Sequence, residues 1–365
     1  MPTFTRLPVE VLNQIIGELC PYCRHDPFEI DISDVLALAS ASRFFHEIAT
    51  PHLYHRTSLK QWWLLARTLI VRPDLARQVR HLVLADTEND LIPHFDPDPP
   101  GLFPLEVEEY CEEQFARWRT SMTGYLHRYP NNRLWYLDLE DGGYDSPFCD
   151  NNPFNIVISL CPDLRKLDVM LRCRNPFTLS LPNSLPRLKE VTLNSIDGDL
   201  DNEPLLFQAI LRLFQVAPNL ERFICDTVAP TEFREAENDL TGIGPLDRLR
   251  FVEIGRSYMS IWDFDRLLRL CPNLEQLHYE NGTASANGGP LMLPREIQNS
   301  LQNLAPSSLR IFTLNQEPEE SDGYAWGGAT WDWHDDDLDS LQAALNGRGI
   351  VFKSNLIQEE SGKEL

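Results

Sequence analysis

The sequence predicts an α/β repeat fold, in which short strands recur along the chain with helices between them. Three observations lead to this prediction. Eight short segments share one frame of apolar positions, prolines stand just before several of them, and helical apolar patterns lie between them. Because a single strand–helix unit cannot bury its apolar face alone, neighbouring units are expected to stack into an elongated solenoid.

The shared frame has apolar residues at positions 1, 4 and 6, and the last two alternate in the manner of a half-buried strand. The eight segments are residues 79–84, 134–139, 164–169, 188–193, 220–225, 249–254, 274–279 and 309–314. The units resemble the leucine-rich-repeat family over residues 76–356. They lack the Asn or Cys that the family carries three residues after the third apolar position, so we expect an irregular solenoid. Independent βα units in an ordinary α/β domain are the alternative.

Prolines and helical patterns complete the predicted unit. Four prolines stand two residues before the start of a frame: Pro162, Pro186, Pro218 and Pro272. A proline at this place ends the preceding helix and leads into the next strand. Helices are predicted over residues 205–214 and 264–270, and residues 350–353 are expected to form a closing strand.

The N-terminal residues do not fit the frame and predict three short helices. The first follows Leu7-Pro8, where proline suits the first helical turn, and ends before Pro21. The second follows the candidate N-caps Asp31 and Ser33. The third covers residues 42–49, and Thr50-Pro51 is expected to stop it.

These helices resemble an F-box, whose pattern begins Leu-Pro-x-Glu and later runs Ser/Cys-Lys/Arg-x-aromatic. The departures are the fourteen residues 20–33 between the first two helices and Ala41 in place of a valine. The resemblance implies a set of adaptor-binding residues: Leu7, Pro8, Leu12, Ile15, Ile16, Leu19, Val35, Leu36, Leu38, Ser42, Arg43, Phe45 and Ile48. The order of the segments resembles the large fungal group of F-box proteins.

An F-box binds the Skp-family adaptor of cullin-RING ubiquitin ligases. The resemblance therefore implies a substrate-recognition subunit of an SCF-type E3 ubiquitin ligase, with the repeats binding a protein substrate for ubiquitin-dependent degradation. A repeat scaffold that mediates protein–protein interaction without ubiquitin transfer is the alternative. We expect no enzyme activity, no catalytic residue and no cofactor, because no convergent polar cluster is evident at the ends of the predicted strands.

Charge and composition restrict the partners and the compartment. The chain has 55 Asp and Glu against 32 Lys and Arg, a formal net charge of -23, so we expect no nucleic-acid partner. Its eight cysteines are irregularly spaced and no export signal is evident, so an intracellular location, cytoplasmic or nuclear, is expected. The longest apolar run, residues 62–71, contains Arg67 and is too short to span a membrane.

Cys20-Pro-Tyr-Cys23 matches the redox-active tetrapeptide of glutaredoxins, but it follows a predicted helix rather than a strand. A zinc site of Cys20, Cys23 and His25 would need a distant fourth ligand. We interpret the segment as a linker and predict no metal site. His46, His52 and His55 are interpreted as ordinary surface or packing residues.

Two insertions interrupt the predicted repeats. The second of them carries Trp326, Trp331 and Trp333 among acidic side chains. A solvated acidic loop and a partner-contact surface are both open interpretations. The expected organisation is an F-box over residues 1–59, a bridging helix over 60–75, a solenoid over 76–356 with insertions at 86–133 and 315–340, and an acidic tail over 357–365.

Overall fold

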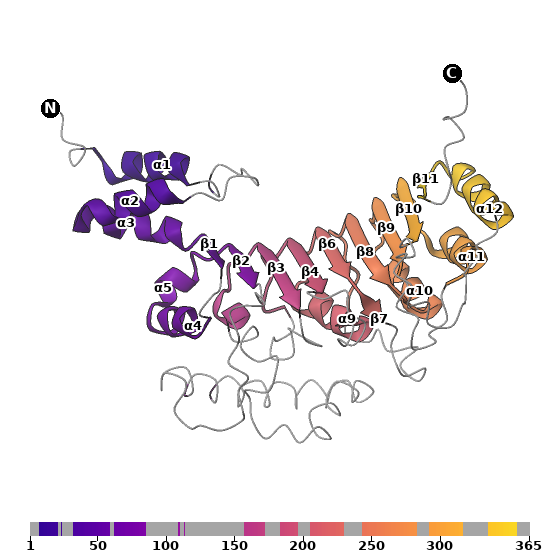
Figure 1. Cartoon of the computed structure of the whole chain (residues 1–365), viewed down its shortest axis with the longest axis horizontal. Coiled ribbons are helices and arrows are strands. Elements are labelled where there is room, and N and C mark those ends of the chain that lie inside the picture. The colour runs from indigo at the N-terminus through magenta and orange to yellow at the C-terminus, as the bar shows by residue number, and fades with distance from the viewer. Residues whose placement is uncertain are drawn as a thin grey trace, which may run out of the picture.

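Nine of the described strands form one parallel sheet, in which they lie side by side in chain order (Figure 1). The computed structural model describes residues 7–20, 23, 32–58, 62–84, 109, 113, 157–171, 183–195, 205–229, 243–282, 292–316 and 335–355. The strands of the sheet are β1 (Arg56–Ser58), β2 (His81–Leu84), β3 (Lys166–Leu171), β4 (Glu190–Ser195), β6 (Arg222–Asp226), β8 (Phe251–Ser257), β9 (Gln276–Asn281), β10 (Ile311–Gln316) and β11 (Val351–Lys353). The predicted α/β class is therefore confirmed.

The repeat frame accounts for most of these strands. Seven of the eight predicted segments form the strands β2, β3, β4, β6, β8, β9 and β10. Every residue at positions 1, 4 and 6 of these seven frames is at most 2% exposed. The predicted closing strand is β11, which pairs with β10.

The remaining frame, residues 134–139, lies outside the described residues. All four residues of β2 pair directly with β3, in the register His81↔Lys166 to Leu84↔Val169. Strands β2 and β3 are therefore direct neighbours in the sheet.

Strand β1 was not predicted, because Arg56-Thr57-Ser58 lacks the apolar alternation of the frame. It nevertheless pairs in parallel with β2, with Thr57 opposite Leu82. Thr57 thus occupies the fourth position of a frame, and it is buried. The sheet begins inside the segment that the sequence assigns to the N-terminal helices.

One hydrogen-bond pattern recurs at the start of each strand. The backbone carbonyl at the second frame position accepts hydrogen bonds from two successive N–H groups of the next strand. The oxygen of His55, for example, accepts from Arg80 at 3.0 Å and from His81 at 2.9 Å. The carbonyls that do this are those of His55, Arg80, Arg165, Lys189, Glu221, Arg250 and Glu275. Because the pattern repeats at the same position, residues of equal frame number align in rows across the sheet.

Helices pack against the buried face of the sheet and share one hydrophobic core with it (Figure 1). They are α4 (Trp62–Val71), α5 (Pro73–Ala76), α9 (Phe207–Val216), α10 (Ile261–Leu270), α11 (Pro294–Leu304) and α12 (Asp335–Asn346). The predicted bridging helix of residues 60–75 is therefore two helices, with Pro73 opening the second. The predicted helix at 205–214 begins at Phe207 instead, because Leu205–Leu206 form the short strand β5, which pairs with β7 (Val228–Ala229).

Three N-terminal helices, α1 (Val9–Leu19), α2 (Ser33–Ala41) and α3 (Arg43–Leu53), have a separate small core. The fully buried members of that core are Ile16, Cys20, Val35, Ala39 and Ala49. A core of this size contributes little free energy of folding, so a unit of this kind depends on further support.

The ends of these helices differ from the prediction in three places. Pro8 is the N-cap of α1 rather than part of its first turn. Ile32 is the N-cap of α2, and it makes no side-chain capping bond. Helix α3 continues through Pro51, because proline there removes only one hydrogen bond near the end of the helix and its fixed φ suits a helix.

The sequence predicts that the apolar run at residues 62–71 is too short to span a membrane, and this run forms α4. Among the helices of the described residues, none is both long enough and apolar enough to cross a membrane. Of the predicted insertion at 86–133, only residues 109 and 113 are described, and Trp326, Trp331, Trp333 and the tail 357–365 lie outside the described residues.

We expect Leu193→Ala to destabilise the chain by about 2–5 kcal/mol, because this buried Leu in β4 lies in the shared core. The neighbouring Asn194 is exposed on the same strand, so Asn194→Ala should change the free energy of unfolding by less than about 0.5 kcal/mol. Urea unfolding of both variants checks this. Equal losses would contradict the assignment of position 6 to the core.

Candidate functional site

The structure divides the predicted adaptor-binding residues by their accessibility. Leu12, Ile16 and Val35 are at most 1% exposed, so they stabilise the helices and are closed to a rigid partner. The half-buried residues are Ile15, Leu19, Leu38, Phe45 and Ile48, and the exposed ones are Leu7, Pro8, Leu36, Ser42 and Arg43.

Ser42 and Arg43 have local roles in α3. The Ser42 side chain is the N-cap of the helix, and its Oγ accepts a hydrogen bond from the Phe45 N–H at 3.2 Å. Arg43 is almost fully exposed, and its Nε donates to Glu47 Oε1 at 3.3 Å within the helix. Both side chains are exposed, and each makes a hydrogen bond within its own helix.

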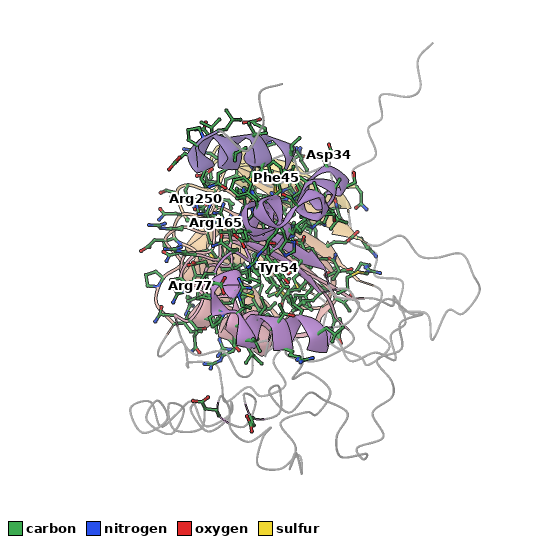
Figure 2. The ribbon with its side chains drawn as sticks, turned by 90° about the vertical axis from the view of Figure 1, so that its left-hand side faces the viewer. Asp34, Phe45, Tyr54, Arg77, Arg165 and Arg250 are labelled. Atoms are coloured by element: carbon green, nitrogen blue, oxygen red, sulfur yellow. The ribbon has the colours of Figure 1, made fainter. Side chains whose placement is uncertain are left out.

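The N-terminal helices also expose apolar side chains. Between 36% and 54% of each of five large side chains is accessible: Leu7, Val9, Val11, Leu36 and Phe44. We call these five residues the apolar set. Val9, Val11 and Phe44 are absent from the predicted adaptor-binding residues, although Val9 and Val11 widen the apolar stripe of the first helix. Figure 2 labels Phe45 and Asp34 in this unit and, below them, Tyr54 between α3 and the first strand of the sheet.

The sheet face opposite the core carries rows of polar side chains. One row, set by the strand register, runs through Arg56, His81, Lys166, Glu190, Arg222, Phe251, Gln276, Ile311 and Val351. Within it, His81 Nε2 lies 2.6 Å from Asp168 Oδ2 of the next row. Burial opposes ionisation of Asp168, but this hydrogen bond and the Lys166 charge outweigh it and lower the pKa of its carboxyl.

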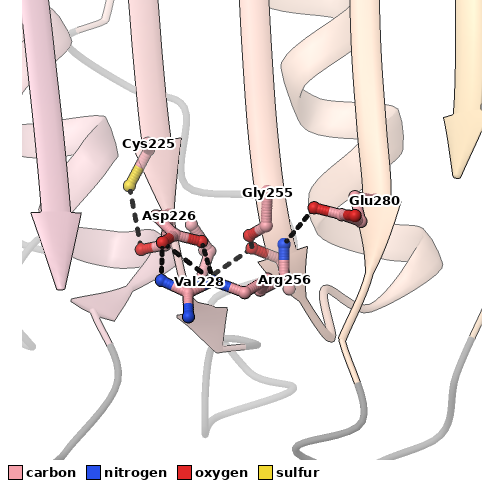
Figure 3. Close-up of polar contacts among 7 residues, drawn as sticks. Cys225, Asp226, Val228, Gly255, Arg256 and Glu280 are labelled. Carbon is pink, nitrogen blue, oxygen red and sulfur yellow. Dashed lines mark hydrogen bonds and ion pairs between the residues drawn. The ribbon is translucent and has the colours of Figure 1, made fainter. Parts of the chain in front are cut away.

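A polar network lies at the carboxyl ends of β6, β8 and β9, the edge at which open parallel sheets bind ligands (Figure 3). The Arg256 guanidinium donates to both carboxylate oxygens of Asp226, at 3.0 Å from Nε. The Arg256 backbone N–H donates to Glu280 Oε2 at 3.4 Å. No sequence motif reveals this cluster, because its members come from three strands that are far apart in the chain.

The backbone of this network is held in an unfavourable conformation. Arg256 and Thr227 have φ values of 38° and 59°, in the left-handed region that residues other than glycine rarely adopt. Val228 N–H donates to Ser257 Oγ at 2.8 Å, and Thr227 N–H donates to the Gly255 carbonyl at 3.0 Å. The opposite charges of Asp226 and Arg256 neutralise each other, so the network suits a rigid binding edge rather than acid–base chemistry.

A shallow hollow of about 290 Å³ lies near the amino ends of the strands. Its lining is Arg165, Pro186, Arg187, Lys189, Asn219 and Arg248. Arg187 and Lys189 pair with Asp163 and Glu221, each at 2.7 Å, so half of its basic side chains are neutralised by neighbours. Figure 2 shows Arg165 and Arg250 along this side of the molecule.

The linker interpretation of Cys20 and Cys23 misses two neighbours. The ligand atoms of Cys20, Cys23, His52 and His55 all lie within 4.8 Å of one another. A hydrogen bond between the two thiols lowers the pKa of Cys20 against the effect of its burial and raises the pKa of Cys23. The sequence contained the signal, a Cys-x-x-Cys and a His-x-x-His, but the two pairs were interpreted separately.

The chain matches no model of a known protein family and no curated protein. Its described residues offer two candidate binding surfaces, the apolar set on the N-terminal helices and the polar face of the sheet.

We expect Gly282→Ala to destabilise the chain by about 1–3 kcal/mol, because a Cβ there would stand 2.5 Å from the Arg256 carbonyl oxygen. Gly244 has no atom within 4 Å of such a Cβ, so Gly244→Ala should be neutral or slightly stabilising. Thermal unfolding of both variants checks the pair. A neutral Gly282→Ala would show that the edge around Arg256 is not rigid.

Proposed function

We propose that the chain is a non-catalytic recruiter, in which α1–α3 act as an F-box-type module and the sheet with its helices acts as a leucine-rich-repeat-type solenoid. On this proposal the module binds a Skp-family adaptor of an SCF-type ubiquitin ligase. The solenoid binds a protein substrate, which the ligase then modifies.

The apolar set is the observation that carries the proposal. Its five side chains are between 36% and 54% exposed, on a unit whose own core is small. Five large apolar side chains left accessible on a unit with so small a core provide apolar area that a partner protein can cover. A partner that covers the exposed half of such a side chain gains roughly 1 kcal/mol from each.

The solenoid part of the proposal is supported by the order and register of the strands. Strands that follow each other in chain order, from β1 to β11, are the arrangement expected of stacked repeats. The rows on the outer sheet face offer a long surface with both signs of charge, for example Lys166 beside Glu190. Such a surface suits recognition of a polar protein segment and favours no single sign of charge.

The second candidate is a scaffold that binds partner proteins without ubiquitin transfer. It uses the same two surfaces, so binding alone does not separate the two functions. Substrate turnover does, because deleting a ligase subunit lengthens the half-life of its bound partners, whereas deleting a scaffold leaves it unchanged.

Introducing a negative charge into the apolar set tests adaptor binding. We expect Val9→Asp and Leu36→Asp each to weaken binding of a Skp-family adaptor to the full chain by at least about tenfold, since each removes an apolar contact and buries a charge. Val9 lies in the first turn of α1, where an acidic side chain is favourable, so the fold should be kept. Binding is measured by calorimetric titration.

Leu293→Asp is the matched control. Leu293 is 48% exposed and is the N-cap of α11, a position that Asp favours, far from the N-terminal helices in the chain. It should bind the adaptor as the unmodified chain does. If the unmodified chain does not bind, or if all three variants bind alike, the apolar set is not an adaptor site.

A further inference from the structure

Four side chains from two distant segments meet at the end of α1. Cys20 follows α1 directly, and a turn closed by the hydrogen bond from Cys23 N–H to the Cys20 carbonyl, at 3.0 Å, brings the second thiol back toward the first. His52 lies in the last turn of α3, and His55 lies just before β1. Cys20 and His55 are buried, while Cys23 and His52 are half-buried.

The distances fit a tetrahedral metal site. Cys23 Sγ lies 3.4 Å from His52 Nδ1 and 3.2 Å from His55 Nδ1, and Cys20 Sγ lies 4.0 Å from His55 Nδ1. In a tetrahedral zinc site, Zn–S bonds of about 2.3 Å and Zn–N bonds of about 2.0–2.1 Å place sulfur and nitrogen about 3.6 Å apart. The three observed distances bracket this value.

The ligand types identify the metal. Two thiolates and two imidazoles are soft to borderline donors, and this set in tetrahedral geometry selects zinc over the oxygen-seeking cations. The four residues complete the coordination shell by themselves, which is the pattern of a structural site rather than a catalytic one.

The cluster lies where α1, α3 and the first strand of the sheet meet, so a bound ion would stabilise this junction. The carbonyl of His55 accepts the hydrogen bonds from Arg80 and His81 that begin the sheet. The core of the N-terminal helices is small, and Cys20 is one of its five fully buried members. A link between the end of α1, the end of α3 and the first strand supplies the support that this core lacks.

We propose that Cys20, Cys23, His52 and His55 bind one structural zinc ion that fastens α1 to α3 and to the start of the sheet. The ion adds a direct link between the end of α1 and the end of α3, beyond the apolar contacts of the small core. The inference concerns the folding of the N-terminal helices and does not depend on adaptor binding.

The test is the zinc content of the purified full chain with its thiols reduced, measured by plasma mass spectrometry. We expect about one zinc ion per chain. Cys23→Ser and His52→Asn should each weaken zinc binding by more than about 100-fold, since even the loss of an outer-shell partner costs 10–100-fold. His46→Asn, at an exposed position of α3 outside the cluster, should keep the ion.

Cobalt substitution gives a readout that does not need the variants to fold. The metal-free full chain with Co²⁺ should develop the intense visible bands of tetrahedral cobalt and a sulfur-to-cobalt charge-transfer band. The proposal is overturned if the reduced chain holds no zinc and gives no such spectrum. It is also overturned if Cys20 and Cys23 form a disulfide in the native chain, or if His52→Asn and His46→Asn retain zinc equally.

Discussion

The register of the sheet depends on one repeated interaction, the carbonyl at the second frame position that accepts two N–H groups from the next strand. From His55 to Glu275 this contact is made at each step of the ladder. It fixes each strand relative to its neighbour, so that positions 1, 4 and 6 always face the helices. Because a shift of one residue would turn the apolar side chains to the opposite face, the core and the register support each other.

The two faces of the sheet follow from this register. The inner face is continuous from α4 to α12 as one hydrophobic core, in which the strands contribute Leu, Val, Ile, Phe, Cys and Tyr side chains. The outer face is free to carry charged and polar residues in rows. At its carboxyl edge, the Asp226–Arg256 pair and the close approach of Gly282 to Arg256 hold the backbone in a strained conformation. The register of the strands therefore determines where the polar side chains at this edge of the sheet lie.

Much of the fold could be predicted from the sequence, because the frame is a local pattern with a strong apolar signal. Leu277 and Phe312 are recognisable as strand core without knowledge of their neighbours. The apolar pattern did not predict elements whose position depends on pairing with distant parts of the chain. Arg56-Thr57-Ser58 joins the sheet through backbone pairing with β2, which side chains do not reveal. The two polar clusters could not be predicted from the sequence for the same reason. Asp226, Arg256 and Glu280 meet only when β6, β8 and β9 pair, and Cys20 meets His55 only when α1 lies against α3.

The central claim is that the N-terminal helices, and not the sheet, hold the adaptor surface. Hydrogen–deuterium exchange of the full chain, with and without a Skp-family adaptor, tests it most directly. The account predicts slower exchange confined to residues 7–20 and 32–53 when the adaptor is present. Protection in the strands β2 to β10, or no change in the helices at saturating adaptor, would contradict it.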